Sequence, residues 1–142
     1  MKNLRLLLAG LAAMILAGCV TPFRAPRDLS HIKLDRVHSP VVEVEKIWLE
    51  RKNGVLVVKG FVLKRLEADD TTQTHLHATL YDEAGRELRT AGANFEPRQI
   101  VRRFRRHGDA TYQVVLDPLP AETARIEIRA HEGEHATPSP GN

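Results

Sequence analysis

The sequence predicts a single all-β domain, built as an antiparallel β-sandwich. Three observations predict it. Between residues 41 and 132, apolar residues recur at every second position in several short runs, as in strands that bury one face. Turn-forming residues and prolines separate these runs. No run of comparable length carries apolar residues at helical spacing.

The predicted strands cover about residues 41–50, 54–64, 73–81, 86–93, 98–105, 110–116 and 124–131. Between the first two, Asn53-Gly54 suits a two-residue hairpin turn, because both central positions need positive φ. Gly85 suits the left-handed position of a longer turn that starts at Asp82. Seven short strands in about ninety residues fit a sandwich of immunoglobulin-like type.

The first strand contains an irregularity in its alternation. Val42 and Val44 share one face, whereas Ile47 and Leu49 have the opposite parity. A bulge near Lys46, or a strand that crosses between the sheets, would bring all four side chains inside.

Two aromatic residues are interpreted as structural. Trp48 is expected to belong to the core or to form a half-buried cap, in preference to a ligand platform. Tyr112 opens a strand after Asp109 and is assigned to the core, with its hydroxyl bonded to nearby backbone as in a tyrosine corner.

The amino-terminal segment has the composition of a signal peptide, predicted to cover residues 1–18. Lys2 and Arg5 precede an apolar stretch from Leu6 to Leu16, which is shorter than the roughly 20 residues that span a bilayer. The stretch ends in Leu16-Ala17-Gly18-Cys19. This motif resembles the lipobox of bacterial lipoproteins. The resemblance implies cleavage before Cys19 and acylation of its thiol with diacylglycerol.

An acylated Cys19 has further consequences, because it is the only cysteine in the chain. No thiol is then left for a disulfide or for nucleophilic catalysis. Stable attachment to a membrane needs two or more acyl chains. Val20 follows where lipoproteins of the inner membrane often carry aspartate, so the resemblance favours the outer membrane. The alternative is an ordinary signal peptide, or a retained anchor, with an incidental cysteine.

The mature chain is expected to have three parts: a lipidated tether over residues 19–40, the domain over 41–132 and a disordered tail over 133–142. Removal of residues 1–18 leaves 124 residues, with 19 basic and 18 acidic side chains. The mature chain is therefore nearly neutral, and its charge gives no reason to expect nucleic acid as a partner.

A second resemblance lies inside the predicted domain. The run Ala78-Thr79-Leu80-Tyr81-Asp82, followed by Gly85, is similar to the signature of FxLYD-type domains. The segment Val58–Val62 also resembles their second strand. These are small β-sandwiches of exported bacterial proteins and lipoproteins, without established catalytic activity. The resemblance implies a binding or scaffolding role.

Catalytic groups are not predicted. The serines Ser30, Ser39 and Ser139 all fall in the expected tether or tail, which cannot hold a nucleophile rigidly beside a base. Glu67, Asp69 and Asp70 cluster in one predicted loop, where solvated acids are common. We therefore expect a protein that is not an enzyme and that carries no cofactor.

A metal site is a secondary hypothesis. His75 and His77 lie two apart on a predicted strand, so both imidazoles point to one face. Copper and zinc accept imidazole ligands, and His131 or His135 could supply a third. The alternative is a pair of polar side chains that face solvent.

The densest positive charge lies in the predicted strand 98–105 and just beyond it, at Arg102, Arg103, Arg105 and Arg106. An edge strand tolerates such charges, which block edge-to-edge aggregation. The same arginines could instead contact lipid phosphates, lipopolysaccharide or an acidic envelope protein, because guanidinium donates two hydrogen bonds to a phosphate.

The sequence therefore predicts an envelope lipoprotein, anchored through Cys19 to the outer membrane, with its domain facing the periplasm. Its expected role is that of a non-catalytic binding or scaffolding module. The alternative function is a periplasmic copper- or zinc-binding lipoprotein.

Overall fold

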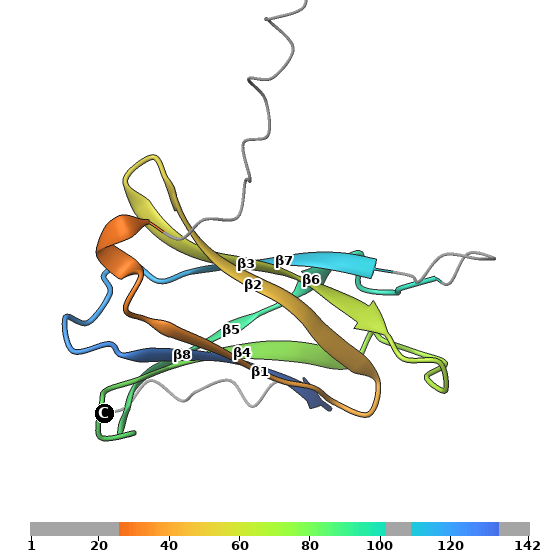
Figure 1. The fold of residues 1–142 in the computed structure, drawn as a ribbon. Coiled ribbons are helices and arrows are strands. Elements are labelled where there is room, and N and C mark those ends of the chain that lie inside the picture. Colours follow the sequence, from red (N-terminus) through yellow and green to blue (C-terminus); the bar gives the residue numbers. More distant parts are fainter. Residues whose placement is uncertain (1–25, 102–108, 134–142) are drawn as a thin grey trace, which may run out of the picture.

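The structure, a computed structural model, describes residues 26–101 and 109–133. Within them the chain forms one 3₁₀ turn and eight strands, which pack as two four-stranded sheets (Figure 1). The predicted all-β sandwich is confirmed. The elements are η1 Arg27–Leu29, β1 Lys33–Val37, β2 Val42–Lys52, β3 Val55–Lys64, β4 Thr74–Tyr81, β5 Glu87–Ala93, β6 Phe95–Glu96, β7 Asp109–Val115 and β8 Arg125–Glu132.

The two sheets have the strand orders β1-β8-β4-β5 and β2-β3-β7-β6. In the described part of the chain every pairing is antiparallel except that of β1 with β8, which is parallel. The strand count and the parallel pair both differ from the predicted seven-stranded antiparallel arrangement. Strand β1 accounts for the parallel pair, and it lies inside the segment predicted as a tether.

Strand β1 corrects the predicted boundary at residue 41, because the folded part includes η1 and β1. None of the five residues of β1 is fully buried, and the strand shows no alternation of buried apolar and exposed polar side chains. It is an edge strand, and edge strands tolerate charged side chains. Asp35 lies 3.1 Å from the ammonium of Lys33 and 3.5 Å from the guanidinium of Arg125.

The predicted strand 98–105 is wrong in its described part, because residues 98–101 form no strand. The remainder lies outside the described residues. The side chain of Thr71 supplies the hydrogen bonds that a neighbouring strand would otherwise provide. Its hydroxyl donates to the carbonyl of Arg98 at 2.6 Å and accepts from the amide of Ile100 at 2.9 Å. The short strand β6 pairs with β7 instead.

The irregularity in β2 is a bulge, as predicted. The register of β2 against β3 shifts between Val44 and Lys46. Val42, Val44 and Leu49 are buried, and Ile47 packs against the core. One extra residue therefore turns apolar side chains of both parities to the inside.

Side chains satisfy the two carbonyl groups at this bulge. The guanidinium of Arg36 donates a hydrogen bond to the carbonyl of Glu45. The hydroxyl of Tyr112 donates to the carbonyl of Lys46 at 3.2 Å. Tyr112 is only 3% exposed, which confirms its assignment to the core. Gly60 of β3 lies against the Lys46 carbonyl and the Tyr112 hydroxyl, and a Cβ at this position would overlap both groups.

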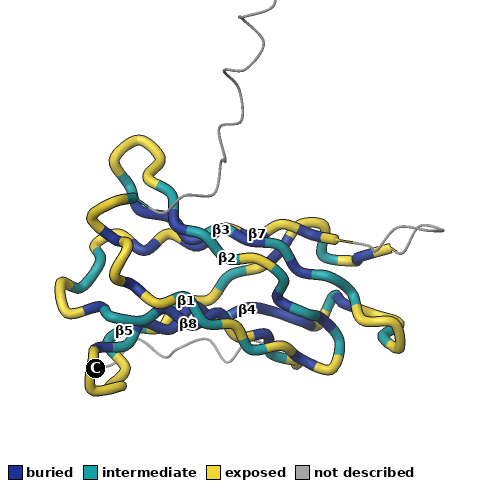
Figure 2. The backbone as a smooth tube through the Cα atoms, viewed as in Figure 1, coloured by how far each residue is buried: buried dark blue, intermediate teal, exposed yellow. Residues whose placement is uncertain are grey.

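The core fills the space between the sheets, where the buried stretches of the two layers face each other (Figure 2). Both sheets contribute large side chains that are almost completely inaccessible. The largest of these are Phe95, Leu49, Leu76, Leu80, Ile100, Leu116, Ile126 and Ile128. Leu80 pairs in register with Ile126, and Ala78 with Ile128, so β4 and β8 form the centre of one layer.

Both predicted hairpin turns are confirmed. Asn53 and Gly54 have φ values of 52° and 81°, as the β2–β3 turn requires. Gly85 has a φ of 78° in the β4–β5 turn. There the amide of Asp82 donates to the carbonyl of Arg86 at 3.1 Å and closes the loop.

Candidate functional site

Two of the predicted sites lie outside the described residues. These are Cys19, with the signal peptide, and the arginines at 102, 103, 105 and 106. Residues 26–101 and 109–133 include no helix with the length and hydropathy needed to cross a bilayer. The anchor and the arginine contact surface therefore stay predictions.

The predicted pair His75 and His77 lies on β4, and the structure brings His131 of β8 beside it. His75 and His131 are directly paired in register, and His77 is the next residue on the same face of β4. His75 is buried, whereas His77 and His131 are half-buried. The strand alternation identified the first two residues. The third follows from strand pairing, which brings together residues 56 positions apart.

The three imidazole rings form a compact cluster. The ring centres of His75 and His77 are 5.0 Å apart, those of His75 and His131 are 5.6 Å apart, and those of His77 and His131 are 4.5 Å apart. His75 and His131 are stacked, with 17° between their planes. In the described part of the chain, no group of three or more histidine, cysteine or acidic side chains is placed to hold a metal ion as it stands. His135 lies outside that part.

The same face of the sheet continues as a row of alternating charges. Glu127 is buried and lies between two arginines of β8, at 3.3 Å from Arg125 and 2.9 Å from Arg129. The guanidinium of Arg125 also lies over the ring of Tyr81, 3.9 Å from its centre. These groups neutralise and orient one another, and such an arrangement stabilises the outer face of the β8–β4 pair.

The outer face of the other sheet carries an aromatic pair. Trp48 of β2 and Phe61 of β3 have ring centres 5.4 Å apart, and both side chains are half-buried. Trp48 is therefore a half-buried cap, one of the two structural roles expected for it, and it lies over the outside of the sheet. The pair borders an open hollow of about 520 Å³ that also includes Lys59 and Gln113.

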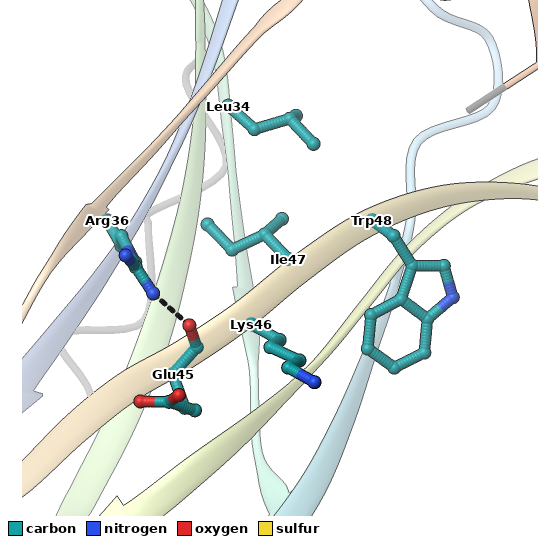
Figure 3. Close-up of a pocket in the computed structure, with 6 residues that line it drawn as sticks. All are labelled: Leu34, Arg36, Glu45, Lys46, Ile47 and Trp48. Atoms are coloured by element: carbon teal, nitrogen blue, oxygen red, sulfur yellow. Dashed lines mark hydrogen bonds between the residues drawn. The ribbon is translucent and has the colours of Figure 1, made fainter. Parts of the chain in front are cut away.

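A smaller hollow of about 290 Å³ lies between the edge strands β1 and β2 (Figure 3). Leu34 and Ile47 form its apolar floor and pack against the core. Arg36 points from β1 to the carbonyl of Glu45 and crosses the gap between the two sheets. Because the hydrogen bond from Arg36 ends on the bulge of β2, we assign this hollow to the bulge structure.

Several acidic side chains in the described residues have structural partners. The Lys59 ammonium, 2.7 Å from Glu50, lowers the pKa of that carboxyl group. Hydrogen bonds from Thr72 lower the pKa of Asp70 in the predicted acidic loop. Hydrogen bonds and the charge of Arg86 lower the pKa of Asp82.

Serine and tyrosine hydroxyl groups also have structural roles. Ser39 accepts hydrogen bonds from the amides of Val41 and Val42, at 3.1 and 3.0 Å, and shapes the connection between β1 and β2. Burial raises the pKa of Tyr112 above its usual range. Its phenol is therefore protonated at neutral pH and acts as a hydrogen-bond donor to the bulge.

Comparison with known proteins gives no relative: no family model matches the chain, and neither a curated protein nor a solved structure matches it. The lipobox and the FxLYD-type resemblance stay predictions from the residues that carry them.

Proposed function

We propose that the protein is a bacterial envelope lipoprotein that acts as a non-catalytic binding or scaffolding module. The observation that carries the proposal is the lipobox Leu16–Cys19 followed closely by a folded domain. Acylation of Cys19 would fix the domain to the membrane. By the identity of Val20, the proposed location is the outer membrane, with the domain in the periplasm.

The described fold supports a shorter connection to the membrane than the sequence indicated. Only seven residues, 20–26, separate Cys19 from the start of η1 at Arg27. Chain geometry limits the distance between Cys19 and Arg27 to at most about 30 Å. An anchored domain would therefore meet partners at the membrane surface at high local concentration, so weak contacts could give useful occupancy.

The proposed contact surface includes Arg102, Arg103, Arg105 and Arg106. These residues follow β6 in the chain and lead into β7 at Asp109, so they are connected to the sheet that carries Trp48 and Phe61 on its outer face. Guanidinium groups suit lipid phosphates, lipopolysaccharide or an acidic protein. The competing role is a scaffold in which the arginines only protect an edge.

Crosslinking in intact cells, followed by affinity purification, tests this proposal. The variant Arg103→Glu/Arg105→Glu should lose crosslinked partners, because it reverses two charges in the cluster. The variant Lys52→Glu/Arg65→Glu makes the same change of net charge at exposed positions elsewhere and should retain them. Retention of every partner by the folded arginine variant would contradict a contact role for this segment.

A further inference from the structure

The histidine cluster on the β1-β8-β4-β5 sheet has the spacing that a shared metal ion requires. Copper or zinc binds an imidazole nitrogen at about 2.0–2.1 Å, which places each ring centre about 3.2 Å from the ion. For ligand angles between about 90° and 120°, two ring centres are then about 4.5–5.5 Å apart. The observed separations are 4.5, 5.0 and 5.6 Å.

The orientation of the rings, rather than their spacing, separates this cluster from a metal centre. The stacked rings of His75 and His131 do not aim their nitrogens at one point, and no three-ligand site is preformed in the described residues. Rotation about the side-chain bonds changes the aim of a ring without moving its strand. The antiparallel register of β4 and β8 already fixes the three backbone positions.

The register places two residues beside His77 on the neighbouring strands. Its partner on β5 is Gly92, which has no side chain to occupy the neighbouring position of the sheet face. Its partner on β8 is Arg129, whose guanidinium is held by Glu127 at 2.9 Å. The positive charge nearest to the cluster in the register is therefore paired with a carboxylate, which reduces its repulsion of a bound cation.

The geometry points to a three-histidine site for one Cu²⁺ or Zn²⁺ ion, with His75, His77 and His131 as ligands. Three neutral imidazoles without a thiolate suit these two ions, and divalent copper binds more tightly than zinc to the same nitrogen ligands. Hard cations such as Mg²⁺ prefer oxygen ligands and are not bound. The ion bridges β4 and β8. This site does not depend on the lipid anchor or on the arginine segment.

Isothermal titration of the chain from residue 20 onward with Zn²⁺ and Cu²⁺ tests the proposal. We expect one ion per chain, tighter binding of Cu²⁺ and no binding of Mg²⁺. Zn²⁺ should also raise the midpoint of thermal unfolding, because the ion binds the folded chain. His131→Gln should weaken binding about tenfold or more, since it removes one of three ligands. His31→Gln changes an exposed histidine outside the cluster and should leave binding unchanged.

Two further measurements distinguish this ligand set from its alternatives. Electron paramagnetic resonance of the copper-loaded chain should show three coordinated imidazole nitrogens, a result that does not depend on any variant being folded. His135→Gln should bind as the wild-type chain does. Fewer than three imidazoles, loss of binding in His135→Gln but not in His131→Gln, or no binding of either ion near neutral pH would overturn the proposal.

Discussion

The hydrogen bond from Tyr112 to the β2 bulge gives the sharpest test of how this fold is held together. The bulge turns Ile47 and Leu49 toward the core, and it leaves the carbonyl of Lys46 facing the Tyr112 hydroxyl. Replacement of Tyr112 by phenylalanine removes one oxygen atom and keeps the ring in the core. The change therefore isolates the hydrogen bond from the packing.

The expected loss is about 1–2 kcal/mol of unfolding free energy. A typical hydrogen bond contributes about 1 kcal/mol, and an acceptor left partly buried without that donor adds to the cost. The distance of 3.2 Å from the Tyr112 hydroxyl to the Lys46 carbonyl is long for a hydroxyl donor. The expected loss therefore lies below the roughly 3 kcal/mol that the largest losses of this kind reach.

Urea unfolding of the chain from residue 20, followed by circular dichroism, measures this loss. The midpoint for Tyr112→Phe should fall by about 0.5–1.5 M urea with an unchanged slope. Tyr81→Phe is the matched control, because the ring over which Arg125 lies is retained and no hydrogen bond to a bulge is removed. Equal midpoints for the two variants would refute the role given to the Tyr112 hydroxyl.

Three further predictions concern packing, turn geometry and pH. Ile128→Ala should lower the free energy of unfolding in urea by about 2–5 kcal/mol, because Ile128 is fully buried. The control Val115→Ala, at a side chain that is 50% exposed, should change it by less than about 1 kcal/mol. Similar losses in the two variants would contradict the assigned core. Gly54→Ala should destabilise the chain by about 1 kcal/mol in the same assay, because φ is 81° at this position. An unchanged midpoint would show that the turn tolerates a Cβ. The lowered pKa of Asp82 stabilises the fold fully above about pH 4, and this contribution is lost as pH falls through the folded pKa. Stability measured from pH 6 to pH 2 should therefore fall less steeply in Asp82→Asn than in the wild-type chain, and parallel curves would contradict this.

Several elements could be predicted from the sequence because their signals are local. The change of parity between Val44 and Ile47 indicated the bulge, since apolar residues of both parities had to reach one core. Asn53-Gly54 and Gly85 indicated turns, because positive φ restricts the choice of residue. Six of the seven predicted strands match strands of the structure.

The predictions of strand 98–105 and of a tether over residues 19–40 were wrong where contacts between distant residues determine the structure. Strand β1 forms by parallel pairing with β8, about ninety residues later in the chain, and its charged residues carry no alternation. Residues 98–100, which follow β6, are shaped by the side chain of Thr71, which contacts Arg98 and Ile100 across 27 and 29 positions. Neither contact has a local signature in the sequence.

The candidate metal ligands also divide into those that local sequence predicts and one that depends on contacts between distant residues. His75 and His77 were recognisable as a pair because strand geometry places residues two apart on one face. His131 could be named only as one of two possible third ligands, because the choice depends on the register of β8 against β4. That register places His131 opposite His75 and turns a pair of histidines into a cluster of three.

The central claim is that the protein is held at the bacterial envelope by a lipid on Cys19. Mass spectrometry of the protein purified from bacterial membranes tests it most directly. We expect a mature chain that starts at Cys19 and carries diacylglycerol on the thiol, and a Cys19→Ser variant that is neither processed nor acylated. A purified chain with an unmodified Cys19 thiol, or membrane attachment and processing unchanged by Cys19→Ser, would contradict the claim.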